Sequence, residues 1–163
     1  MDYLTRARDE IHRTAGRLDL PSLVRETNGK WSPAQVLEHL TLAFTANHAV
    51  LEKALASGEV RGRVPGLKQW LARILVVELG YFPPVKAPDA TVPRGMIAPE
   101  RSVAAACEAL SALDAAFARI AERFGHRARV ANHMYLGGMT VHQWRKFHWR
   151  HVRHHMKSLI HNP

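Results

Sequence analysis

Apolar residues recur at alternating steps of three and four between Pro99 and Gly125, and this spacing constrains the fold more than any other feature of the sequence. The residues at these steps are Val103, Ala106, Leu110, Leu113, Phe117, Ile120 and Phe124. Because a helix completes a turn in about 3.6 residues, they share one face. A continuous apolar face has to pack against other helices, so this segment predicts one member of a helical bundle.

Three further segments show the same periodicity. The first covers residues 2–18, and the second runs from Ser32 to Ser57. The third begins after Thr140. Ser32 and Thr140 are each followed three residues later by glutamine, which is the pattern of a capping box at a helix start. The sequence thus contains four long amphipathic helices.

A long connection separates the predicted helix at 32–57 from the one that begins at Pro99. It contains a shorter apolar segment, 67–79, which predicts one extra short helix, and then a proline-rich stretch, 80–98, which predicts an extended chain. Strand signals are nearly absent. The sequence therefore predicts a single all-α domain over residues 1–163, a four-helix bundle whose long crossover carries one short helix.

Length and composition agree with a compact domain. The chain has 163 residues, enough for a sizeable core. No apolar run approaches the roughly 18 residues of a membrane helix, and the charged start MDYLTRARDEIHR does not resemble a secretory signal. Cys107 is the single cysteine, so no internal disulfide can form. We expect a cytoplasmic protein without a membrane partner.

The formal charge of +9 is unevenly distributed. After Glu122 no acidic residue follows, whereas basic residues do, namely Arg127, Arg129, Arg145, Lys146, Arg150, Arg153 and Lys157. A basic end can attract nucleic acid, anionic lipid or a small anionic substrate. A solvated face is the simpler interpretation, and we favour it. Because the sequence lacks a reading-helix motif and a basic platform interleaved with aromatics, nucleic acid is not an expected partner.

The stretch FHWRHVRHH, residues 147–155, is unusually rich in histidine. On a helical projection with His151 at zero, His155 lies at about 40° and His148 at about 60°, close to Trp144. His154 lies at the rim of this arc. The basic residues of the segment gather on the opposite face, namely Lys146, Arg150, Arg153 and Lys157. The inner histidines therefore point with aromatic residues toward the bundle interior, while the basic residues face water.

His151 and His155 are one turn apart, a spacing that suits two nitrogen ligands of one metal ion. His148 is seven residues from His155, about 10 Å along the helix axis, so it does not fit the same ion. We assign His148 a pocket role, as a residue behind the ligands or as a general base, against the alternative of a core histidine stacked on Trp144. Nothing in the sequence supports a pocket role for His133.

His39, on the second helix, supplies a candidate third ligand. It shares a face with the apolar residues Val36, Ala43, Ala46, Val50 and Ala54. The alternative is a core histidine bonded to a carbonyl or to Tyr135, because a buried imidazole needs hydrogen-bond partners. Three inward histidines on two helices favour a metal site made of His39, His151 and His155.

At these residues the chain resembles a known family. WSPAQVLEHL (31–40) is similar to the second-helix signature of the DinB-like and YfiT-like four-helix bundle superfamily, and WRKFHWRHVRHHMKSL (144–159) to its last-helix H-x-x-H-H pattern. GYFPPVKAPDATVPRG (80–95) resembles the crossover of one branch. One departure is clear. Many members have Arg-Gly-Gln after the histidine pair, whereas this chain has Met156, Lys157 and Ser158.

The resemblance implies a divalent metal ion held by three histidines, which carry over to His39, His151 and His155. It implies zinc or nickel, with water completing the coordination. It also implies a metal-dependent transferase that activates a low-molecular-weight thiol, or a hydrolase, and a homodimer. The departure after His155 leaves the substrate and the subfamily open.

Three interpretations of function follow. The first is an enzyme that uses a metal ion with open positions on a small electrophilic substrate, since three imidazoles leave room for water or substrate. Imidazole suits zinc, nickel, iron and copper alike, so the ligands do not select the metal. The second is a binding module with a basic surface for nucleic acid or protein. The third is a bundle whose histidines only pack.

Overall fold

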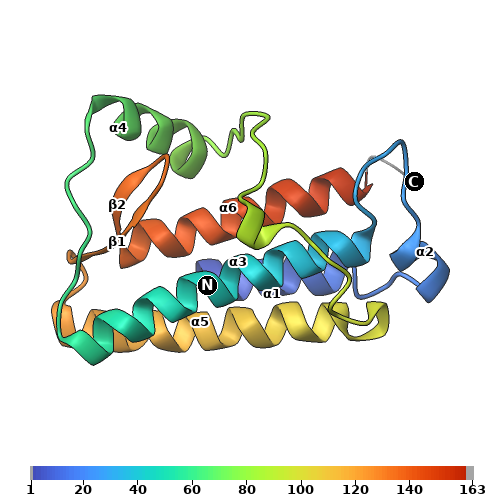
Figure 1. The fold of residues 1–163 in the computed structure, drawn as a ribbon, viewed down its shortest axis with the longest axis horizontal. Coiled ribbons are helices and arrows are strands. Elements are labelled where there is room, and N and C mark those ends of the chain that lie inside the picture. The colour runs from blue at the N-terminus through green and yellow to red at the C-terminus, as the bar shows by residue number, and fades with distance from the viewer. Residues whose placement is uncertain (1, 161–163) are drawn as a thin grey trace.

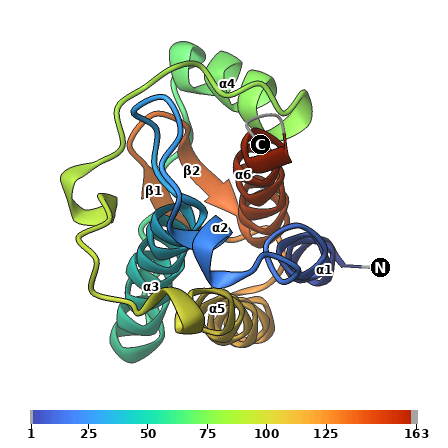
Figure 2. The ribbon, with the colours of Figure 1, turned by 90° about the vertical axis from the view of Figure 1, so that its right-hand side faces the viewer.

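The computed structural model describes residues 2–160 and shows the predicted all-α bundle. Four helices lie side by side, as the end-on view makes plain (Figure 2). They are α1 (Tyr3–Thr14), α3 (Pro33–Ser57), α5 (Ser102–Phe124) and α6 (Val141–Ile160). Helix α3 packs mainly against α5, and α1 packs against α6 and α5. None of the helices within residues 2–160 combines the length and the apolar composition that a membrane span requires.

The core lies where the apolar faces of the four helices meet. Most of the α5 seam is buried, including Leu110, Leu113, Phe117 and Ile120, while Val103 and Phe124 at its ends are half-buried. Phe44 from α3 is fully buried among these residues. Burial of a large apolar side chain contributes about 1.5–3 kcal/mol, so this shared core holds the four helices together.

The predicted helix starts are confirmed. The Ser32 hydroxyl accepts from the Gln35 N–H at 3.3 Å, and the Gln35 side chain accepts from the Ser32 N–H at 2.7 Å. Thr140 and Gln143 exchange the same pair of bonds at 3.3 and 3.1 Å. At the other end of α3, Gly58 has a φ of 72°, the left-handed conformation that ends many helices. These local signals fix where α3 and α6 begin, and hence where their histidines lie along the bundle axis.

The N-terminal region differs from the prediction. Helix α1 ends at Thr14, four residues before the expected end at Leu18. A short helix, α2 (Leu20–Val24), lies between the first two long helices, where no helix was predicted. The Asp19 carboxylate accepts from the Ser22 N–H and caps α2, and Pro21 fits the first turn of a helix. This Asp-x-x-Ser capping signal, with proline inside it, is readable in the sequence.

A two-stranded hairpin precedes α6, and the sequence did not indicate it. Strands β1 (Arg129–His133) and β2 (Gly137–Thr140) pair antiparallel and rise toward α4 (Figure 1). The chain at residues 61–62 adds backbone bonds to β1. A Cβ at Gly138 would lie 2.2 Å from the Arg63 carbonyl oxygen, so only glycine fits there. The Gly137–Gly138 pair is therefore needed for close backbone packing rather than only for a turn.

The crossover between α3 and α5 contains the expected short helix and two further turns. Helix α4 (Leu67–Arg73) continues into a π-helix, η1 (Ile74–Glu78), in place of one regular helix to Leu79. The proline-rich stretch is mostly extended but includes a 3-10 turn, η2 (Asp89–Thr91), which packs on α3. A second turn, η3 (Pro99–Arg101), leads into α5. The crossover thus passes over the part of α3 that carries His39.

Loss of the α3 cap tests this reading of the fold. Ser32→Ala removes a buried capping bond, so we expect the free energy of unfolding to fall by about 1 kcal/mol in urea titrations of metal-free protein. Ser111→Ala is the control, because Ser111 is an exposed mid-helix residue and its loss changes stability by less than about 0.5 kcal/mol. Equal effects of both substitutions would contradict the assigned cap.

Candidate metal centre

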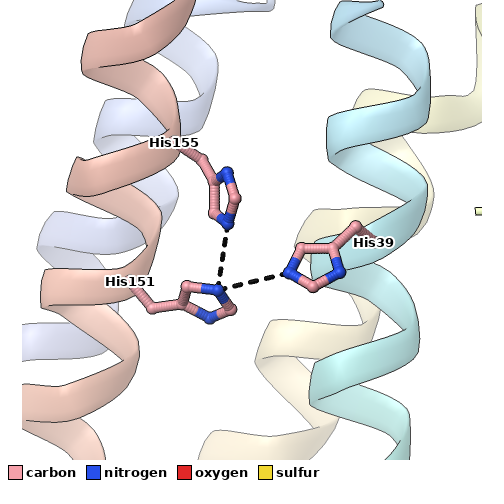
Figure 3. A group of neighbouring side chains, drawn as sticks. All are labelled: His39, His151 and His155. Carbon is pink, nitrogen blue, oxygen red and sulfur yellow. Dashed lines mark hydrogen bonds between the residues drawn. The ribbon is translucent and has the colours of Figure 1, made fainter. Parts of the chain in front are cut away.

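Three histidine rings converge from two helices. His39 lies on α3, and His151 and His155 lie one turn apart on α6 (Figure 3). The His151 Nε2 atom is 3.3 Å from the His39 Nε2 and 3.0 Å from the His155 Nε2. One ligand nitrogen from each ring lies within 4.8 Å of the other two. The structure therefore brings together the three residues that the sequence analysis selected, in positions that could hold a metal ion.

The spacing of these nitrogens fits a shared cation. Two nitrogens bound to one tetrahedral zinc ion at about 2.0–2.1 Å lie about 3.3–3.4 Å apart. The two contacts of the His151 Nε2 atom, 3.0 and 3.3 Å, are close to this value. A single ring N–H on His151 cannot point along both contacts, so hydrogen bonding satisfies at most one of them well. A cation between the rings would satisfy both contacts of His151, and the third pair, His39 and His155, has its ligand nitrogens within 4.8 Å of each other.

The orientation of the His39 ring is set by the crossover. Its Nδ1 lies 2.8 Å from the carbonyl oxygen of Thr91 in η2. Because a carbonyl only accepts, Nδ1 must carry the proton, and the Nε2 lone pair faces His151. Hydrogen bonds of this kind behind a metal ligand fix its tautomer and ring angle. A bond from His39 to a carbonyl was expected as an alternative to metal binding. In the structure this bond is made by Nδ1, and Nε2 still faces His151.

Glu38 holds the crossover in place beside His39. Its carboxylate is buried and accepts three backbone N–H bonds, each 3.0 Å long, from Arg94, Gly95 and Met96. These residues follow η2 directly, so Glu38 fixes the segment whose Thr91 carbonyl orients His39. On a helical projection Glu38 points about 100° away from His39. Its role depends on a loop conformation for which the sequence gives no signal.

Burial keeps the three imidazoles neutral. Desolvation lowers the pKa of His39, and the Thr91 hydrogen bond opposes this in part. Burial, together with the neighbouring histidines, lowers the pKa of His151 well below its ordinary value. The same causes lower the pKa of His155 to about 3. All three rings are therefore neutral near neutral pH, each with one nitrogen free of a proton, and this is the state in which imidazole binds metal.

The histidines lie in the wall of a large cavity. Its volume is about 840 Å³, in the range of pockets that bind small molecules. The cavity lies between α3, α4, the crossover, the hairpin loop and α6. Its walls are mostly apolar and include four aromatic residues, namely Trp31, Phe82, Tyr135 and Phe147. Phe82 stacks on both His151 and His154. A ligand in this cavity can reach the open side of a metal ion held by the histidines.

His148 does not lie in the cavity wall. It is fully buried in the bundle core, stacked on Trp144 with ring centroids 5.8 Å apart and in contact with Phe44 and Phe147. Neither ring nitrogen has a hydrogen-bond partner within the described residues. The predicted role as a base or a pocket residue therefore has no geometric support, because substrate does not reach this ring. The core histidine stacked on Trp144, the alternative considered from the sequence, is the observed arrangement.

His133, which the sequence gave no role, lines the cavity. It lies at the end of β1 and packs edge-on against Phe147, with ring centroids 5.0 Å apart. The Phe147 ring in turn lies 5.7 Å from that of His151. The His133 Nδ1 accepts from the Tyr135 N–H, and burial lowers its pKa to about 4. His133 is thus neutral, with its proton on Nε2. The position of His133 in the cavity wall depends on the β1–β2 hairpin, which was not predicted from the sequence.

Glu38→Gln tests whether the crossover positions His39. A glutamine side chain has one accepting oxygen and cannot hold three N–H donors, so the Thr91 carbonyl loses its fixed position. We expect zinc affinity, measured by chelator competition, to fall about tenfold or more, with helical circular dichroism retained. Glu59→Gln, at an exposed surface pair, is the control. Unchanged affinity in Glu38→Gln would refute the positioning role.

Acid sensitivity tests the burial of His148. Its pKa is lowered from 6.5 to about 3 by desolvation first and by His133 second. Below pH 6.5 His148 binds a proton in the unfolded chain but not in the folded one. The free energy of unfolding therefore falls as the pH falls toward about 3. We expect His148→Phe to make the loss of unfolding free energy between pH 6.5 and 4 shallower, by up to about 1.4 kcal/mol per pH unit, in metal-free protein. A slope identical to that of wild type would contradict this burial.

Comparison with known proteins identifies a family but no activity. Neither the curated proteins nor the solved structures contain a match to this chain. A family model described as a protein of unknown function, DUF1569, matches residues 55–162. The matched range contains the crossover, His151 and His155, whereas Glu38 and His39 precede it. Because the match covers more than half of the chain, this protein belongs to the DUF1569 family.

Proposed function

We propose that this protein binds one divalent metal ion through the Nε2 atoms of His39, His151 and His155, and that it is a metal-dependent enzyme for a small electrophilic substrate. One observation carries the proposal. The three ring nitrogens lie within 4.8 Å of one another in the wall of a cavity of about 840 Å³. A closed structural site has no need of such a cavity beside its ligands.

The ligand set supports a catalytic site. Structural zinc sites are filled by four protein ligands, whereas catalytic sites have three and keep a position for water or substrate. Within the described residues, the cluster around His151 has three candidate ligands and no fourth. A divalent ion held there supplies a Lewis acid that lowers the pKa of a bound water or thiol.

The residues around the ligands divide the remaining tasks. The Thr91 carbonyl holds His39 in the tautomer whose Nε2 can bind a metal ion. Glu38 holds the loop that follows Thr91. The aromatic residues of the wall make the cavity beside the histidines largely apolar. Among the described residues that line the cavity there is no carboxylate, and His133 and His154 are two further imidazoles there that could exchange a proton.

The resemblance to DinB-like proteins supports the choice of chemistry. That superfamily combines a four-helix bundle with one histidine on the second helix and two on the last, which is the arrangement of the trio here. On this basis we propose zinc or nickel as the metal and transfer of a low-molecular-weight thiol, or hydrolysis, as the reaction. A homodimer is proposed on the same basis.

The contacts of the basic residues weigh against the alternative of a basic binding module. On α6, Arg145 pairs with Asp114 and Lys146 pairs with Glu78. Arg150 donates to the backbone carbonyls of Val77 and Glu78. Lys146 and Arg150 were expected to face water, but η1 packs over both of them, so this part of α6 serves the fold. Arg153 remains exposed.

Metal content is the first test of the proposal. Protein purified without a histidine tag should contain close to one divalent ion per chain by elemental analysis. His151→Ala should abolish tight binding with its helical circular dichroism largely intact, because it removes the central nitrogen of the trio. His48→Ala, on the opposite face of α3, is the matched control. A wild-type protein that stays free of metal after titration would refute the site.

Metal-dependent turnover is the second test. We expect slow hydrolysis of an activated aryl ester, or transfer of a small thiol to an activated aryl halide, that stops on chelation and returns with zinc or nickel. His151→Ala should show only the background rate, because it no longer binds the metal ion tightly. Activity that survives both chelation and His151→Ala would place the reaction elsewhere in the protein.

A further inference from the structure

We propose that the cavity selects a small organic acid with an apolar, ring-sized body, held with its carboxylate at Lys68 and Lys86 and its other end toward the three histidines. This inference rests on the proposed function, because it takes the metal end of the same cavity as the reacting end. The walls, the charged groups and the size of the cavity each support one part of it.

The walls favour an apolar body. Between His39 and Asn47, α3 presents the small residues Ala43 and Ala46 to the cavity, which leaves a trough about 12 Å long at 1.5 Å per residue. Aromatic side chains cover this trough from the other elements, namely Trp31, Phe82, Tyr135 and Phe147. A ring with a short chain fits such a trough, since aromatic walls stack on ring faces. A strongly hydrated ligand would lose its water there with few polar groups to replace it.

The charged groups favour an anion. Lys68 and Lys86 line the cavity, and both are exposed, so we infer that their ammonium groups lie at its mouth. No aspartate or glutamate lines the cavity within the described residues, and neither lysine forms an ion pair there. Two cations without a partner carboxylate attract a negatively charged ligand and repel an ammonium.

Gln69 adds a neutral donor beside Lys68. Its side-chain oxygen accepts from the Gly66 N–H at 3.2 Å, so its amino group is the part left for a ligand. Lysine with an adjacent amide donor is a suitable pair for a carboxylate, which accepts several hydrogen bonds. The donors at the mouth and the apolar trough thus define an amphipathic acid rather than a sugar or an amine.

A matched series of probes tests this selection by titration calorimetry. The probes are 4-phenylbutyrate, its neutral amide 4-phenylbutyramide, and butyrate, each with zinc-loaded and with chelator-treated protein. We expect 4-phenylbutyrate to bind about fivefold or more tightly than the amide, and butyrate to bind least. The preference for the acid should persist without metal, because the lysines and not the ion hold the carboxylate.

Two double variants identify the groups responsible. Lys68→Met with Lys86→Met should remove the preference for the acid over the amide and leave binding of the amide unchanged. Lys53→Met with Arg61→Met removes two exposed cations outside the cavity, and the preference should remain. An equal loss in both double variants would mean that only net charge matters, and it would overturn the inference.

The remaining outcomes separate this inference from the proposed function. If the acid binds only to zinc-loaded protein, whether or not the lysines are present, the carboxylate is a metal ligand and the inference fails while the metal site stands. If the lysine-dependent preference appears in a protein that never takes up metal, the inference stands and the proposed enzyme fails. Absence of 4-phenylbutyrate binding to either form overturns the inference.

Discussion

The hydrogen bond between His39 and the Thr91 carbonyl is the contact on which the rest of the site depends. It fixes the proton on Nδ1 and leaves the Nε2 lone pair aimed at the two histidines of α6. The neighbouring Glu38 carboxylate secures the same loop through three backbone bonds. Glu38 and His39 are consecutive residues of α3 with linked roles. Glu38 holds the loop, and the Thr91 carbonyl next to that loop orients His39.

The bundle explains why the site is both rigid and accessible. Helices α3 and α6 are long, capped and packed into a common core, so the bundle itself fixes the backbone that carries the histidines. Small residues on α3 and the wide crossover open a cavity on the side that the core leaves free. Helix α6 contributes to both parts, because it turns His148 into the core and His151 and His155 toward the cavity.

Local sequence signals predicted the helices and the histidine trio, and non-local contacts account for what they missed. Periodicity and caps located α3, α5 and α6 because those elements follow from neighbouring residues alone. The hairpin was missed because glycine at 138 is required by a backbone 75 residues away in sequence order, at Arg63. Glu38 and His133 were missed because their partners lie in loops. His148 was misplaced because a 60° offset on a helical wheel does not distinguish the core from the cavity beside it.

X-ray absorption at the metal edge of protein loaded with one equivalent of zinc tests the central claim most directly, since it counts imidazole ligands. The account predicts a first shell that contains three imidazole nitrogens at about 2.0–2.1 Å together with oxygen from solvent, and a loss of one imidazole in His39→Ala. A shell with fewer than three imidazoles in the wild type, or one that His39→Ala leaves unchanged, would contradict it.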